Sequence, residues 1–170
     1  MGLVGKIFGG FKGTLTKSVD VGSAAHDVNP SSNVAWEIAD GAGDNQAQLL
    51  FGDTRQLAAS ASENLDLAGA LADAFGRTLT FTAVKAIIVE APATNTNNVL
   101  VGGAASNAVP LFGDATDVVA VKPGGKLILT APKTGFTVTA GTGDILKVAN
   151  SGSGTAVDYT ITVIGLGTSA

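Results

Sequence analysis

The chain has 170 residues, no cysteine and a formal net charge of −4 at pH 7. A domain of this length can bury a core without disulfide bonds, and the absence of thiols excludes cysteine nucleophiles and cysteine-ligated metal sites. The ten Lys and Arg residues are scattered, which argues against nucleic-acid binding because phosphate neutralisation needs clustered cations. Charged residues are only 14% of the chain, so we expect either a β-protein rich in small residues or a surface partly buried against other subunits.

No segment of the sequence is typical of a membrane protein or of an exported protein. No apolar run reaches the roughly 18 residues of a membrane helix, and the first residues lack the uninterrupted apolar stretch of a signal peptide. We therefore expect a protein that is made in a cytoplasm, is not exported by the usual route and has no membrane partner.

Residues 1–22 are expected to form an apolar N-terminal arm, distinct from a single domain at 23–170. Five apolar residues of this arm fall at the spacing of one helix face, namely Leu3, Val4, Ile7, Phe8 and Phe11. Five glycines within the first 13 residues interrupt that face and disfavour a helix. Two alternatives remain: an extended arm or first strand that packs on its own domain, and an arm that becomes ordered only against a neighbouring subunit.

The segment after the arm alternates between turns and strands. The sequence Asn-Pro-Ser-Ser-Asn at 29–33 predicts a turn. Residues 34–38 alternate between apolar and other side chains, which predicts a half-buried strand. Two further strands are expected at 46–51 and 56–60.

The middle of the chain is less clear at 64–75, where two interpretations compete. The Ala and Leu content and the spacing of apolar residues favour a helix of about two turns, whereas the alternative is a strand at 65–68 followed by a turn. We expect a strand and then a short helix or a tight turn. Beyond this point, β-branched residues predict strands at 79–90 and 99–101.

The last third of the chain gives the firmest pattern. Pro123 and Gly124 suit the centre of a type II turn, which predicts a hairpin between strands at 118–121 and 126–130. Further strands are expected at 136–139, 145–149 and 158–164. Short strands separated by Gly-rich turns indicate an all-β fold, a β-sandwich or jelly roll, for the main domain.

The titratable residues form no pattern of a catalytic or metal site. His26 is the only histidine, so neither a Ser-His-Asp triad with its neighbours nor a zinc site is supported. The only glutamates are Glu37, Glu63 and Glu90, and the aspartates of the Gly-rich loops are Asp40, Asp44 and Asp53. A glycosidase pair or a calcium loop would use such carboxylates, but solvated strand ends and polar turns explain them. We expect no catalytic residue, no metal and no cofactor.

Two stretches carry a resemblance to a known class of protein. Residues 118–132, VVAVKPGGKLILTAP, and 135–154, GFTVTAGTGDILKVANSGSG, resemble small virion structural proteins of tailed bacteriophages. The likeness extends back towards 79–90 and covers about half of the chain. It implies a non-enzymatic β-sandwich on the capsid surface, a decoration or cement protein that stabilises the phage head by bridging subunits of the major capsid protein.

The same resemblance implies self-association into a homotrimer. In this interpretation, the five apolar residues of the arm contact the capsid or a neighbouring chain and become ordered on binding. Two other functions stay open: a structural protein of the phage tail, in its tube, tip or baseplate, and a module that binds host-surface glycans.

Overall fold

The computed structural model describes residues 2–10, 12–18, 20–28 and 34–170. Every regular element in this part of the chain is a β-strand, which confirms the all-β prediction. The strands are β1 (Gly5–Gly9), β2 (Gly13–Ser18), β3 (Ser23–Val28), β4 (Val34–Asp40), β5 (Gln46–Ala47), β6 (Leu49–Leu57), β7 (Ser62–Asp66), β8 (Ala68–Ala72), β9 (Thr78–Glu90), β10 (Val99–Gly102), β11 (Val118–Val121), β12 (Lys126–Thr130), β13 (Phe136–Thr137), β14 (Ile145–Asn150) and β15 (Val157–Ser169).

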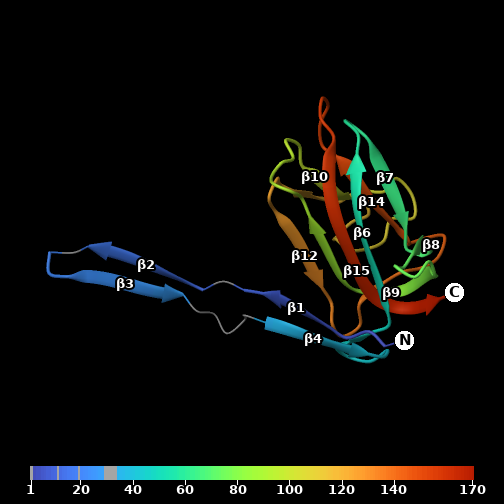
Figure 1. The fold of residues 1–170 in the computed structure, drawn as a ribbon, viewed down its shortest axis with the longest axis horizontal. Helices are drawn as coiled ribbons and strands as arrows, with labels where there is room; N and C mark the ends of the chain where they lie inside the picture. The colour runs from blue at the N-terminus through green and yellow to red at the C-terminus, as the bar shows by residue number, and fades with distance from the viewer. Residues whose placement is uncertain (1, 11, 19, 29–33) are drawn as a thin grey trace.

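Two sheets pack face to face and form the body of the molecule (Figure 1). The main sheet has the strand order β12-β9-β15-β6, with β8 and β13 also paired to β9, and the second sheet has the order β11-β10-β14-β7. Buried apolar side chains from both sheets form one continuous core between them. The predicted β-sandwich is therefore confirmed.

The inner face of β15 shows how the sequence pattern specifies this packing. Tyr159, Ile161 and Val163 are fully buried in the core, and the intervening Thr160 and Thr162 are only partly buried. Successive side chains of a strand point to opposite faces, so the alternation predicted at 158–164 fixes which face of β15 meets the second sheet.

Two glycines let β15 pass close to β9 where the ladder between them shifts register. A Cβ atom at Gly165 would lie 2.2 Å from the carbonyl oxygen of Ala83, and one at Gly167 would lie 2.0 Å from that of Thr80. Gly167 also has a φ of 151°, in the region that favours glycine. Side chains at these positions would therefore push the two strands apart.

The hairpin predicted between 118–121 and 126–130 is wrong, although its turn exists. The Gly125 amide donates to the carbonyl of Lys122 at 2.7 Å, and Gly124 has a φ of +76°, as the sequence predicts. However, β11 pairs with β10 in the second sheet and β12 pairs with β9 in the main sheet. Backbone hydrogen bonds from the turn to Ala91 direct the chain across to the end of β9, so the turn joins the two sheets.

Two other predictions need correction. The strands expected at 46–51 and 56–60 are mostly one strand, β6, because Gly52 and Asp53 pair in register with β15 and do not form a loop. Residues 64–75 contain no helix: β7 and β8 are followed by a tight turn, which is one of the two forms expected after the first strand. Pairing of β8 with β9 outweighs the helix propensity of its Ala and Leu residues.

The first strands form two successive antiparallel ribbons (Figure 1), and the short β5 pairs in parallel with the end of β4. We call β1 with β4 the root ribbon, and β2 with β3 the tip ribbon. The root ribbon pairs residues 5–9 with 34–38, and the tip ribbon pairs 13–18 with 23–28. The root ribbon lies against the sandwich, whereas the tip ribbon projects away from it (Figure 1). Both ribbons therefore include residues after position 22.

The root ribbon is held by a second apolar cluster on the outer face of the main sheet. Ile7, Trp36 and Ile38 are buried there against Ala86 of β9 and Ile164 of β15. Strand β9 therefore has apolar cover on both faces, because Ile87 and Val89 point into the sandwich core. The prediction of a strand at 34–38 is confirmed, and its half-buried character is confirmed at Trp36, Glu37 and Ile38.

A buried lysine fastens the loop that follows the root ribbon. Lys85 is only 1% exposed, and its ammonium group donates to the carbonyl oxygens of Gly43 at 3.4 Å, Pro132 at 3.1 Å and Lys133. Three carbonyls match the three donors of an ammonium group. The Asn45 amide also donates to Pro132 at 3.0 Å, so the loop after β4 is tied to the loop after β12.

Replacing Ile7 with Ala should loosen the root ribbon while the sandwich stays folded. The change removes buried apolar contact from the second cluster and should cost about 2 kcal/mol. Trp36 is the only tryptophan, so its fluorescence emission should shift to the red as it gains water. Phe8→Ala, at the adjacent position on the exposed face, is the control and should leave the emission unchanged. Unshifted emission in Ile7→Ala would contradict this role of the cluster.

Candidate interaction surface

The structure separates the five apolar residues predicted for the arm. Ile7 is buried and Leu3 packs beside it, whereas Val4 and Phe8 are exposed. Phe11 lies outside the described residues. Grouping these side chains on one helix face is wrong, because β1 is a strand and its period of two places Ile7 and Phe8 on opposite faces.

The tip ribbon exposes apolar side chains and has no core of its own. Leu15 is 72% exposed, and Val21, in the connection between β2 and β3, is 93% exposed. Residues paired across an antiparallel ladder share a face, so Leu15 with His26 and Lys17 with Ala24 form one face of the ribbon. We call this the Leu15 face. The opposite face is polar and includes a 2.6 Å hydrogen bond from the Thr14 hydroxyl to Asp27.

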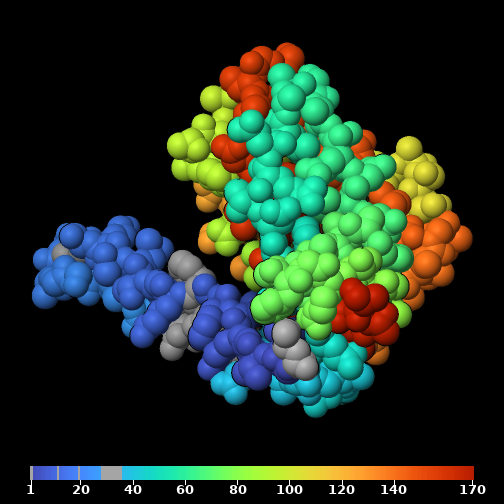
Figure 2. Space-filling view, turned by 45° about the vertical axis from the view of Figure 1, so that its right-hand side comes forward, coloured from blue at the N-terminus to red at the C-terminus, as the bar shows by residue number. Residues whose placement is uncertain are grey.

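A groove of about 830 Å³ opens beside the root ribbon. Its floor includes the first half of β6 and the outer face of β15 near the C-terminal end of that strand. Gly2 and Leu3, which precede β1, form one wall with Asp40, and the turn after β8 forms the other. Leu50 and Phe75 bring exposed apolar surface to the groove. Figure 2 shows the start of the chain and the segment after β8 beside each other on one face of the molecule.

Hydrogen bonds and an ion pair shape both walls of the groove. On one side, Asp40 accepts the Leu3 amide at 3.1 Å. On the other, Asp73 accepts the amides of Phe75 at 2.9 Å and Arg77 at 3.0 Å, and forms a 2.6 Å ion pair with the Arg77 guanidinium. That guanidinium also lies 5.8 Å from the centre of the Phe75 ring. Both walls therefore have defined shapes.

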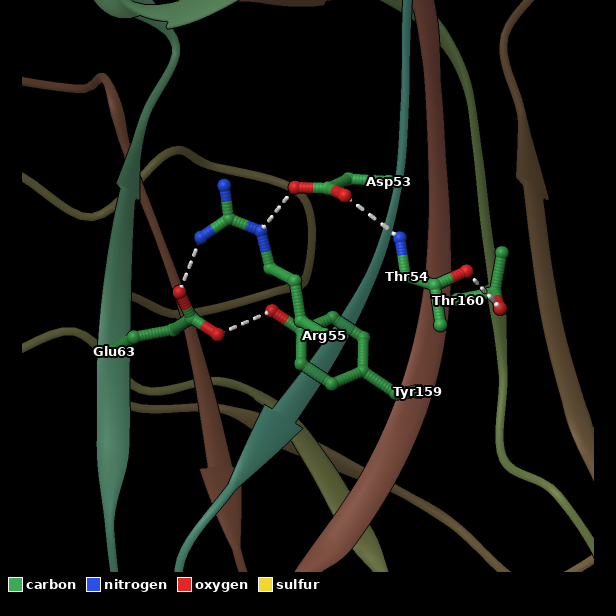
Figure 3. Close-up of polar contacts among 6 residues, drawn as sticks. All are labelled: Asp53, Thr54, Arg55, Glu63, Tyr159 and Thr160. Atoms are coloured by element: carbon green, nitrogen blue, oxygen red, sulfur yellow. Dashed lines mark hydrogen bonds and ion pairs between the residues drawn. The ribbon is translucent and has the colours of Figure 1, made fainter.

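A polar cluster joins the two sheets (Figure 3). The Tyr159 hydroxyl on β15 donates to Glu63 Oε1 on β7 at 2.7 Å, and Arg55 Nη1 on β6 donates to Glu63 Oε2 at 2.5 Å. Arg55 Nε also donates to Asp53 at 2.9 Å. Since β7 belongs to the second sheet and β6 and β15 to the main sheet, Glu63 links the two sheets.

The chemistry of this cluster is that of a structural contact. Burial, reinforced by the hydrogen bond to Glu63 and its charge, raises the pKa of Tyr159 above its ordinary value. The phenol therefore keeps its proton at neutral pH and serves as a donor. Both oxygens of Glu63 are engaged by Tyr159 and Arg55, which fixes the carboxylate between the sheets.

The other titratable residues considered from the sequence lie apart. His26 is exposed, as expected, but belongs to strand β3 and not to a loop. Glu37 and Glu90 form ion pairs with Lys6 and Lys126, both at 2.7 Å. The hydrogen bond and charge of Lys6 lower the pKa of Glu37. Within residues 2–10, 12–18, 20–28 and 34–170, no three His, Asp or Glu residues form a group that could hold a metal ion.

Comparisons with known proteins found no relative of this chain. No family model matches the sequence, and no curated protein or solved structure matches it. The resemblance to virion proteins therefore stays a prediction. In the part of the chain that the structure describes, no helix is long and apolar enough to cross a membrane.

Sequence reasoning missed three parts of this surface. The alternation of Thr14, Leu15 and Thr16 before the glycine at position 22 was a detectable hairpin signal. The groove could not be found in the same way, because it combines residues from five segments, at 2–3, 40, 48–52, 73–79 and 162–169. The link from Tyr159 to Glu63 spans 96 positions, and no local pattern encodes it.

Replacing Tyr159 with Phe should destabilise the sandwich by about 1–2 kcal/mol, because Glu63 loses a buried hydrogen-bond donor. Urea unfolding followed by circular dichroism measures this change. Thr160→Val is a matched control on the opposite face of β15, where the Thr160 hydroxyl contacts only Thr54, at 3.1 Å. This control should change the stability by less than about 0.5 kcal/mol. Equal effects of the two variants would show that the link between the sheets is not stabilising.

Acidification should release the turn at 73–77. Desolvation opposes ionisation of Asp73, but the hydrogen bonds and charge of Arg77 and the Phe75 amide outweigh it and lower the pKa of Asp73. Because the folded-state pKa lies below the unfolded one, the ionised form stabilises the turn above a pH of about 4. That stabilisation is lost as the pH falls through the lowered pKa.

The amide NMR signals of Phe75 and Arg77 should report this transition below pH 4. Asp73→Asn keeps a side-chain oxygen that can accept from the backbone but has no titrating carboxyl, so the transition should vanish in this variant. A transition that persists in Asp73→Asn, or one centred above the ordinary aspartate pKa, would contradict the assignment.

Proposed function

We propose that this chain is a non-enzymatic structural protein of a bacteriophage virion, a capsid decoration protein that stabilises the head by bridging major capsid subunits. The tip ribbon is the observation that carries the proposal. It projects from the sandwich and exposes Leu15 and Val21. A two-stranded ribbon is at best marginally stable in water without a third strand or an apolar surface to pack on. A neighbouring subunit supplies that surface in an assembly.

The sandwich and the tip ribbon have different roles in this proposal. The residues that resemble virion proteins, 118–132 and 135–154, lie in β11 to β14 and their connecting turns. They belong to the body that sits on the shell, and the tip ribbon is the attachment element. Copies of the chain associate as a homotrimer on the capsid surface. A protein that binds only the assembled shell stabilises it by mass action.

The test compares particles assembled with the wild-type chain and with the double variant Leu15→Ser/Val21→Ser. Cryo-electron microscopy should show density of the wild-type sandwich on the icosahedral shell. Co-sedimentation with the shells should weaken by more than about 30-fold for the double variant, because each buried aliphatic side chain contributes about 1.5–3 kcal/mol. Circular dichroism should show that the variant is folded.

The matched control is Val118→Ser/Ile128→Ser, which removes two exposed aliphatic side chains from the sandwich. This control should bind the shells like the wild type. Density confined to the tail would replace the capsid proposal with the tail alternative, and equal binding by the two double variants would remove the tip ribbon as the attachment element.

A further inference from the structure

The groove and the tip ribbon are complementary in charge. The charged residues that line the groove are Asp40, Asp73 and Arg77. Asp73 forms an ion pair with Arg77, so the net negative charge of the lining comes from Asp40. The charged side chain on the Leu15 face of the tip ribbon is Lys17, and Asp27 lies on the opposite face. The Leu15 face is therefore basic, and opposite potentials favour one orientation of docking.

The groove and the tip ribbon also both expose apolar surface. Leu50 is 45% exposed and Phe75 is 70% exposed beside the groove, and Leu15 is 72% exposed on the ribbon. Docking would remove all three side chains from water.

The floor of the groove includes a strand edge. Strand β6 is the last strand of the main sheet, and its only ladder among the described residues is with β15. An unpaired edge is a template for an added strand. The outer strand of the tip ribbon can add to this edge, so backbone hydrogen bonds would supplement the side-chain contacts.

We propose that the tip ribbon of one copy docks in the groove of a second copy, with the Leu15 face against Leu50 and Phe75, and Lys17 near Asp40. The ribbon leads away from its own sandwich (Figure 1). The groove is lined in part by Gly2, Leu3 and Asp40, at the root of the same ribbon. A copy therefore receives a ribbon from a neighbour. One ribbon and one groove per copy give an exchange that closes as a reciprocal pair or as a ring.

The inference rests on the proposed function only in taking the tip ribbon as an attachment element. It identifies the neighbour that receives the ribbon as a second copy of this chain. The capsid is then bound by an assembly that the chain forms with itself.

Disulfide trapping tests this contact directly, because the wild-type chain has no cysteine. Full-length Leu15→Cys and full-length Leu50→Cys are mixed and oxidised, and the mixed disulfide is measured on a non-reducing gel with the two proteins tagged differently. Two matched controls replace one partner each. Ile128→Cys replaces Leu50→Cys in the first control, because Ile128 is 44% exposed on β12 at the other edge of the main sheet. Thr16→Cys replaces Leu15→Cys in the second, because Thr16 is next to Leu15 and on the opposite face of the ribbon.

The pair with cysteines at positions 15 and 50 should give at least fivefold more mixed disulfide than either control pair. Lys17→Glu in the cysteine-15 protein should lower that yield several-fold, with a larger effect at low salt. Light scattering of the wild-type chain should show a species larger than a monomer. Equal yields in all pairs, or a wild-type monomer at every concentration, would overturn the exchange.

The two proposals fail separately. If the chain is found on the shell but positions 15 and 50 are not trapped, the exchange between copies is overturned and the decoration function is retained. The ribbon would then dock on a capsid subunit. If the chain is trapped as expected but is absent from the shell, the exchange is retained and the decoration function is overturned.

Discussion

The long central pair of strands, β9 and β15, is the constraint on which the rest of the structure depends. Each has 13 residues, and both are apolar on two faces over part of their length. Ile87 and Val163 face the sandwich core, while Ala86 and Ile164 face the opposite way. A sandwich covers one face of such a pair, so the other face needs a second layer. The root ribbon provides it, and this requirement determines where β1 and β4 must pack.

The same constraint explains why the two ribbons differ. The root ribbon has an apolar surface to cover, and Lys85 and Asp40 tie its loop and its first strand in place with hydrogen bonds. The tip ribbon lies beyond the edge of that surface, where its own ladder and the hydrogen bond from Thr14 to Asp27 hold it together. The root ribbon is therefore packed on the sandwich, whereas the tip ribbon is exposed to solvent.

Local patterns predicted the parts of the fold that depend on neighbours along the chain. The alternation at 158–164 and the turn at Gly124 are examples, since both follow from the preferences of a few adjacent residues. The pairing of β11 and β12 with different sheets was not predictable, because it depends on Ala91, about thirty positions away. The hydrogen bond between Tyr159 and Glu63 was not predictable for the same reason, because its two residues meet only after the sheets pack.

The N-terminal arm shows that a helical spacing of apolar residues can be misleading when both faces of a strand carry apolar side chains. Ile7 and Phe8 are adjacent, and a helix would place them on one side, whereas the strand directs Ile7 to the main sheet and Phe8 to solvent. On the outer side of β1, the Phe8 ring lies 5.4 Å from the Lys6 ammonium group and stays largely exposed. The exposed apolar positions continue onto the tip ribbon at Leu15 and Val21. Exposed apolar side chains along a projecting element are the pattern expected of an interaction surface, which is why the tip ribbon is the element that we propose contacts another subunit.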